Sequence, residues 1–163
     1  MLFDFANSVF PAVIVSVVFN YFFIQVVVGN EDGRGDLLWG RAVSLSALIV
    51  AVSSPLLGAI ADRAGVRKRL MGLYVAMCVT AVALFSTLGP GAVFWAFLLF
   101  VIANVGFEGS LVFYNAYLPD IVPKERQGWV SGLGFAVGYV GSVGGLALAI
   151  PFAESNICLL YTS

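Results

Sequence analysis

One carboxylate, Glu108, interrupts a long apolar stretch of the sequence, and it is the residue there most able to do chemistry. Asn104, Glu108, Leu111 and Asn115 follow one another at helical spacing, so the polar members share one face of a helix. Leaving a bare carboxylate in hydrocarbon is costly, so we expect this face to point inward. It could bind a substrate or carry a coupling proton. A polar contact between packed helices is an equally good interpretation.

Two more polar residues, Asp4 and Asn7, stand at the start of the first apolar stretch. Asp4 could cap a helix and interact with the positive end of the helix dipole, and we favour that role over transport chemistry. Both residues remain candidates for lining a substrate or proton pathway.

Several kinds of chemistry are excluded by what this sequence lacks. It contains no histidine, so a Ser-His-Asp triad and a His-ligated metal are ruled out within it. Two cysteines are too few for a disulfide framework or a cysteine-rich metal site. The net charge of −1 gives no sign of nucleic-acid binding. We therefore expect no catalytic residues, no metal and no cofactor, and we do not expect an enzyme.

The elements that must position these residues are membrane-spanning helices. Hydrophobic residues make up 61% of the chain and charged residues only 10%, against about 25% charged residues in soluble domains. The apolar runs are about twice the ~9 to 11 residues that a membrane strand needs, and they do not alternate. The sequence predicts an all-α polytopic membrane protein with five helices, at about 5–28, 37–61, 70–88, 92–118 and 129–152.

The basic residues predict how these helices are oriented. Six of the eight lysines and arginines fall in the connections 62–69 and 119–128, which the positive-inside rule places in the cytoplasm. The start of the chain is then cytoplasmic. Trp39, Trp95 and Trp129 stand near predicted helix ends, where we expect them to anchor the helices at the lipid headgroups.

The first of these connections carries a recognisable motif. It resembles the signature loop of the major facilitator superfamily, and the positions that fit are Gly58, Asp62, Arg63, Gly65, Arg67 and Lys68. Val66 departs from the pattern, which usually has a basic residue there. The resemblance implies a latch that steadies one conformation of a transporter. A merely basic cytoplasmic loop is the alternative.

The second connection is similar to the superfamily's link between its fourth and fifth helices. Pro119 is expected to end a helix, while Asp120 and Arg126 lie in the loop. Within the superfamily, residues 4–10, 114–120 and 131–139 are similar to the vacuole-effluxer-like branch, whose eukaryotic members are linked to amino-acid efflux during autophagy. This resemblance makes amino acids the first substrate to consider.

The last predicted helix carries a stripe of small residues. Gly134, Gly138, Gly141 and Gly145 recur at helical spacing, which favours close packing against another helix. The stripe resembles the glycine-rich fifth helix of drug and proton antiporters. That motif has proline at the place of Gly141 and glycine at the places of Ala136 and Val140, so we do not infer antiport.

Taken together, the resemblance implies a fragment of a secondary active transporter that moves a small solute by alternating access. Residues 1–152 would form part of an amino-terminal six-helix bundle in the lipid bilayer, and residues 153–163 look like a non-native tail. Its partners would be the solute, a coupling proton and a missing carboxy-terminal half, but no nucleic acid. The membrane would be a bacterial plasma or inner membrane, or a eukaryotic vacuolar membrane.

Two other functions stay open. A membrane-embedded lipid-modifying enzyme could use Asp62 and Asp120 with the neighbouring basic residues to hold a metal and a phosphate, although each loop offers few carboxylates. A scaffold or channel subunit that does not transport is the other alternative.

Overall fold

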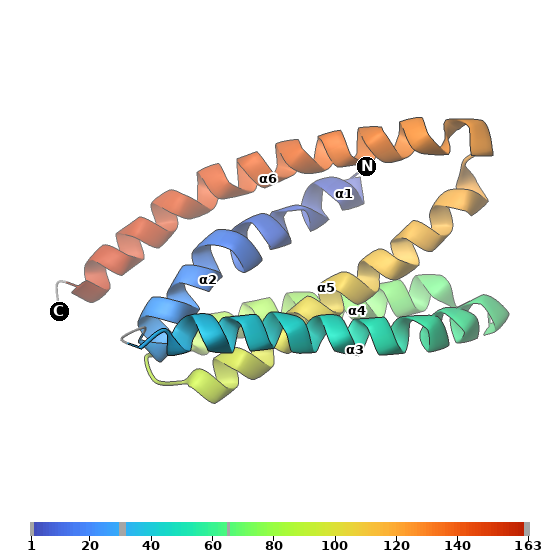
Figure 1. Ribbon diagram of the computed structural model, residues 1–163. Helices are drawn as coiled ribbons and strands as arrows, with labels where there is room; N and C mark the ends of the chain where they lie inside the picture. The colour runs from blue at the N-terminus through green and yellow to red at the C-terminus, as the bar shows by residue number, and fades with distance from the viewer. Residues whose placement is uncertain (1, 30–31, 65, 162–163) are drawn as a thin grey trace. The chain divides into compact units, whose positions relative to one another are not determined.

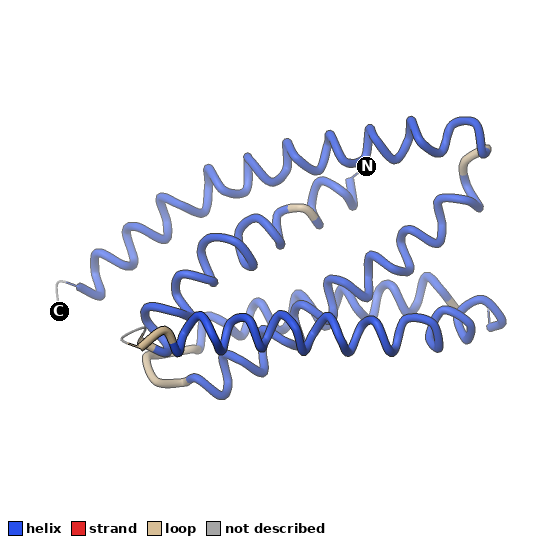
Figure 2. Tube along the Cα trace, in the orientation of Figure 1, coloured by secondary structure: helices blue, strands red, loops and turns tan. Residues whose placement is uncertain are grey.

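The protein is helical over nearly all of the residues that the computed structural model describes, which are 2–29, 32–64 and 66–161 (Figure 2). Short loops join the helices. In chain order the elements are α1 (Leu2–Asn7), the π-helix η1 (Pro11–Val17), α2 (Val18–Tyr21), the π-helix η2 (Phe22–Val28), α3 (Arg34–Ala64), α4 (Arg67–Leu84), the 3₁₀-helix η3 (Phe85–Thr87), α5 (Val93–Ile121) and α6 (Lys124–Tyr161).

Five helical stretches of the described residues are long and apolar enough to cross a membrane. This confirms the prediction of an all-α protein with five membrane helices. The stretches are Phe3–Val28, Arg34–Ala59, Arg67–Thr87, Val93–Ala116 and Lys124–Pro151.

The first span differs from the regular helix that we expected. Two π-helical segments flank the short α2, and Pro11 opens the first of them. Proline has no N–H, so Pro11 cannot donate to a carbonyl in the preceding turn, and the hydrogen-bond register changes at this point. The Ser16 hydroxyl donates to the Pro11 carbonyl at 2.8 Å. At the junction between η1 and α2, Val17 has an unusual backbone, with φ −124° and ψ −77°.

The ends of α5 and α6 also differ from the prediction. Helix α5 continues two residues past Pro119 to Ile121, although the proline removes one hydrogen bond of the helix. Helix α3 likewise runs through Pro55, and membrane helices tolerate such prolines. Helix α6 begins at Lys124 and runs through the segment 153–161, which contains no glycine or proline to stop it. The non-native origin of that tail stays a prediction.

The chain forms two compact units, and the first span is divided between them. One unit contains Met1–Phe22 and Val122–Ser163, and the other contains Phe23–Ile121. In the first unit, α1 runs alongside α6 although the two are far apart in sequence (Figure 1). In the second unit, α5 packs against both α3 and α4.

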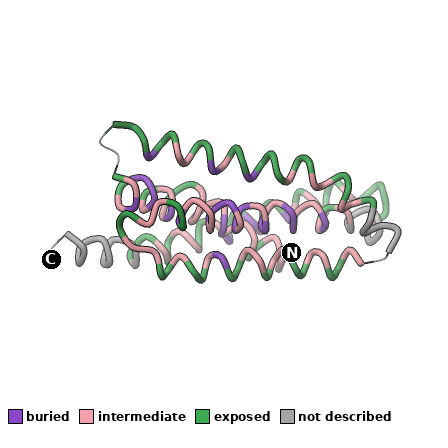
Figure 3. The backbone as a smooth tube through the Cα atoms, turned by 90° about the horizontal axis from the view of Figure 1, so that it is seen from below, coloured by how far each residue is buried: buried purple, intermediate pink, exposed green. Residues whose placement is uncertain are grey.

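Helix α5 carries most of the core of the second unit. The part of α5 that could span the membrane is 56% buried, against 11% for the corresponding parts of α3 and α4. Buried residues are purple in Figure 3. Trp39 does not simply face lipid: its ring lies 4.2 Å from that of Phe100 and 5.5 Å from that of Phe23, measured between centroids. Both phenylalanines are fully buried. This aromatic group fixes the amino-terminal ends of α3 and α5 side by side.

Candidate functional site

Helices α4 and α5 approach closely at two glycines that the sequence analysis did not single out. A Cβ atom at Gly106 would lie 2.8 Å from both the Cys78 nitrogen and the Tyr74 carbonyl oxygen of α4. At Gly109 it would collide with the Tyr74 ring, which also packs against Phe113 at 5.7 Å between centroids. The three-residue spacing of these glycines was the available signal.

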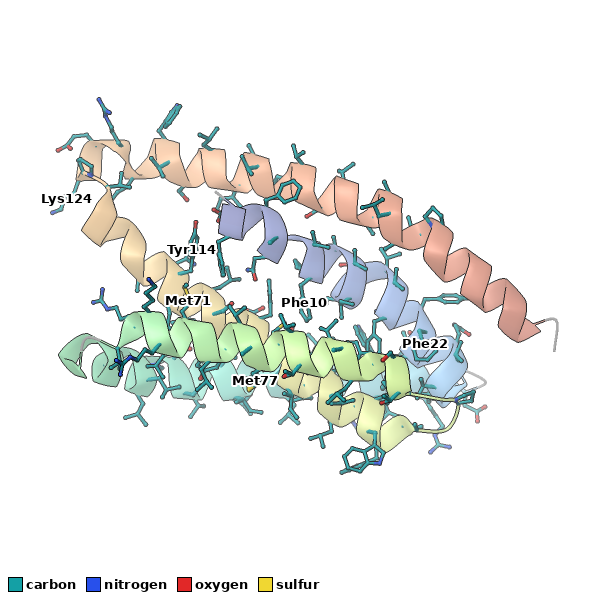
Figure 4. The ribbon with its side chains drawn as sticks, turned by 180° about the vertical axis from the view of Figure 1, so that it is seen from behind. Phe10, Phe22, Met71, Met77, Tyr114 and Lys124 are labelled. Carbon is teal, nitrogen blue, oxygen red and sulfur yellow. The ribbon has the colours of Figure 1, made fainter. Side chains whose placement is uncertain are left out.

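The contacts of α4 with α5 define an antiparallel register. Gly106 meets Cys78 and Gly109 meets Tyr74, so the residue numbers fall along one helix as they rise along the other. Figure 4 labels Met71 on α4 and Tyr114 on α5, which this register brings to the same level. The face of α5 that carries Gly106 and Gly109 is therefore occupied by α4.

A different face of α5 meets α3 through a buried hydrogen bond. The Asn104 amide nitrogen donates to the Ser46 hydroxyl oxygen at 2.7 Å, and that hydroxyl donates to the Val43 carbonyl at 2.8 Å. Ser46 is 0% exposed and Asn104 is 6% exposed. Asn104 is thus engaged in a helix-packing contact. Ser46 was missed because α3 contains several serines and nothing in the sequence distinguishes this one.

The predicted polar face of α5 passes from the interior to the surface within this unit. Asn104 is buried, Glu108 is half-buried and Asn115 is exposed. The same face therefore combines a structural contact at one level with a carboxyl group one turn further along, where cover is less complete. Helix packing accounts for Asn104, and a solute or proton role for Glu108 and Asn115 stays a prediction.

In the first unit, the glycine stripe of α6 lies against the start of the chain. Cβ atoms at Gly138 and Gly141 would collide with the Ser8 hydroxyl and the Phe5 carbonyl oxygen. A Cβ at Gly145 would lie 2.6 Å from a Val9 methyl group. The stripe thus allows two backbones to come together.

The same contact brings the polar residues at the start of the chain against α6. A Cβ at Gly134 would lie 3.4 Å from the carboxyl carbon of Asp4, and Asn7 is half-buried. The Ser142 hydroxyl donates to the Ser8 carbonyl at 2.8 Å and is 3.1 Å from the Gly138 carbonyl. Ser142 was not singled out by the sequence analysis, and it ties the two segments directly.

The signature loop is described only in part. Arg67 opens α4, and its guanidinium donates to the Ala116 carbonyl of α5 at 3.5 Å, a long hydrogen bond. Lys68 is exposed. A Cβ at Gly58 would meet no atom of the described residues within 4 Å. The side chains of Asp62 and Arg63, and the whole of Gly65, lie outside the described residues.

The second connection is also described in part. Arg126 lies exposed in the first turn of α6, and its backbone N–H donates to the Pro123 carbonyl at 2.9 Å. The Asp120 side chain lies outside the described residues. In the part of the chain that the structure describes, no three His, Cys, Asp or Glu residues gather in a way that could hold a metal ion.

Comparison with known proteins gives two relatives and one family. The chain is 32% identical over 162 residues to an uncharacterized MFS-type transporter, YxiO, of Bacillus subtilis (strain 168), covering 98% of this chain and 36% of that protein. It is 28% identical over 159 residues to an uncharacterized protein of Aquifex aeolicus (strain VF5), covering 96% of this chain and 37% of that protein. No solved structure matches.

The chain therefore spans little more than a third of the length of these relatives. The family model described as Major Facilitator Superfamily matches residues 4–146, which include all five membrane spans except the first residue of the first span and the last residues of the fifth. The protein is a multi-pass integral membrane protein, and this chain belongs to the major facilitator superfamily.

Proposed function

We propose that this chain is the amino-terminal part of a secondary active transporter that moves a small solute across a membrane by alternating access. The observation that carries the proposal is the family match over residues 4–146, together with five membrane-spanning helices. The Bacillus relative is described as a transporter, which supports the same function. An enzymatic role has no comparable support.

The rest of the transporter would supply the second wall of the solute pathway. Transporters of this superfamily bind solute near the membrane midplane, between two related halves. The chain spans about a third of its relatives, so the transport activity belongs to the longer protein. The signature loop at Gly58 to Lys68 would act as a latch in that protein and release as the halves change position.

We assign Glu108 to the solute or proton pathway of this half. Ionisable residues within membrane helices usually line such pathways, because an unsupported charge is unfavourable in lipid. Glu108 is only half-buried within its unit, and the α4-facing side of α5 is filled at Gly106 and Gly109. Its carboxyl group is thus on a less covered side of the helix, about two turns before the exposed Asn115.

Amino acids are the first substrate class to test, because of the resemblance to the vacuole-effluxer-like branch. The chain start would lie in the cytoplasm, since the connections 62–69 and 119–128 hold most of the basic residues. The membrane would be the plasma or inner membrane of a bacterium or the vacuolar membrane of a eukaryote.

Uptake by the full-length protein in proteoliposomes tests this function. A panel of labelled amino acids, sugars and organic acids would be offered with and without an imposed pH gradient. We expect at least one amino acid to accumulate, and Glu108→Gln to abolish the response to the pH gradient because the amide cannot take up a proton. Glu125→Gln, the same exchange at an exposed residue in the first turn of α6, is the control. Uptake of no solute refutes transport, and an unchanged pH response in Glu108→Gln refutes the role of Glu108.

A further inference from the structure

The buried hydrogen bond between α3 and α5 fixes the orientation of the Asn104 amide. Ser46 has one hydroxyl proton, and the Val43 carbonyl, 2.8 Å away, can only accept a hydrogen bond. The proton of Ser46 is therefore used there. Towards Asn104, 2.7 Å away, the Ser46 oxygen can only accept, so it must face the NH₂ group of the amide.

The amide oxygen of Asn104 then points away from Ser46. Glu108 follows Asn104 by four residues on α5, and side chains at that spacing are neighbours on a helix surface. A helical side chain also leans toward the preceding turn, so we expect the Glu108 carboxyl group to lie over the turn that contains Asn104. An amide oxygen there can accept a hydrogen bond from a carboxyl group that carries a proton, but it repels a carboxylate.

We propose that Ser46 is a positioning residue for the proton of Glu108: by accepting from the Asn104 amide nitrogen, it turns the amide oxygen toward Glu108 and stabilises the protonated carboxyl group. The inference rests on the proposed function, and it deepens it by naming what holds the coupling proton. Removing the Ser46 hydroxyl frees the amide to rotate, and its NH₂ group can then donate to the carboxylate instead.

Few other groups of this unit can compete with the Asn104 amide for Glu108. Helix α3 contains no titratable residue between Arg41 and Asp62, and the Ser53 and Ser54 hydroxyls there donate to the Val50 carbonyl. The titratable residues that α4 brings against α5 near this level are Tyr74 and Cys78. They meet the face with Gly106 and Gly109, which is not the face of Asn104 and Glu108.

A pH titration of the carboxyl infrared band, followed on the purified full-length protein in lipid, tests the proposal without a substrate. The band that Glu108→Gln removes belongs to Glu108. We expect Ser46→Ala to lower the pH midpoint of this band by about one unit. The variant loses a hydrogen bond to the protonated carboxyl group and gains one to the carboxylate, and one such exchange is of this size. Ser46→Thr keeps the hydroxyl and should keep the wild-type midpoint. Ser44→Ala, on the exposed side of α3, is the matched control.

The outcomes separate this inference from the proposed function. A wild-type midpoint in Ser46→Ala, or an equal shift in Ser46→Thr, overturns the role of Ser46 even if Glu108 governs transport. If Glu108→Gln removes no band that titrates, Glu108 takes up no proton and both claims about its proton fail. A lowered midpoint in Ser46→Ala alone, with uptake still dependent on the pH gradient, supports the inference.

Discussion

The substitution Gly106→Ala should weaken the α4–α5 pair by an amount that the structure lets us work out. The added methyl group would lie 2.8 Å from two backbone atoms of α4, the Cys78 nitrogen and the Tyr74 carbonyl oxygen. An ordinary contact needs about 3.5 Å, so the helices must separate by roughly 0.7 Å. Backbone atoms cannot rotate away as a side chain can. Overpacking of this kind lowers the free energy of unfolding by about 1 to 3 kcal/mol.

Unfolding of the purified full-length protein in mixed micelles, titrated with SDS and followed by circular dichroism, measures this loss. Gly109→Ala should lose less, because its methyl group meets the Tyr74 ring, which can move. Gly72→Ala adds the same methyl group to α4 where nothing lies within 4 Å, and it should leave stability unchanged or raise it by up to about 1 kcal/mol, because alanine favours a helix more than glycine does. If Gly106→Ala were as stable as Gly72→Ala, the close approach of α4 and α5 would be wrong.

Two further predictions concern the other unit and the aromatic group. Gly141→Ala should destabilise the protein by about 1 to 3 kcal/mol, because its methyl group meets the Phe5 carbonyl. Gly144→Ala is the control, since nothing lies within 4 Å of a methyl group there. Equal stabilities of the two variants in the same SDS titration would argue against packing of α6 on α1. In variants that keep a single tryptophan, brominated lipids should quench the fluorescence of Trp39 less than that of Trp95, because Trp39 packs on Phe100 and Trp95 is 61% exposed. Equal quenching would contradict the inward packing of Trp39.

Much of the fold could be predicted from the sequence, because hydrophobicity alone locates helices in a membrane. The number of spans and their approximate positions follow from runs of apolar residues, and backbone groups in lipid have little choice but to form helices. Helix ends were less predictable. Pro119 lies within α5 and Pro55 lies within α3, so a proline in the sequence did not mark where these membrane helices end.

The contacts between helices could be predicted only where small residues form a long pattern. Four glycines of α6 at regular spacing indicated close packing, and the structure lays them against the start of the chain. Gly106 and Gly109 form too short a pattern to stand out. The partner of Asn104 could not be predicted either, because Ser46 is 58 residues away and several serines on α3 are equally plausible in sequence.

The π-helical segments of the first span had only a weak signal in the sequence. Pro11 indicates that one hydrogen bond is missing, but it does not tell whether the helix kinks, stops or changes register. The observed result is a register change that is supported by the Ser16 hydroxyl at the Pro11 carbonyl.

Solute counterflow tests the central claim, alternating access by a transporter that contains this chain, most directly. Proteoliposomes with the full-length protein are loaded with an unlabelled amino acid that they take up, and the labelled form is added outside without an ion gradient. A carrier that exposes its site to one side at a time predicts a transient accumulation of label above its equilibrium level. Label that rises only to equilibrium, as through a channel, or that does not enter at all, would contradict the account.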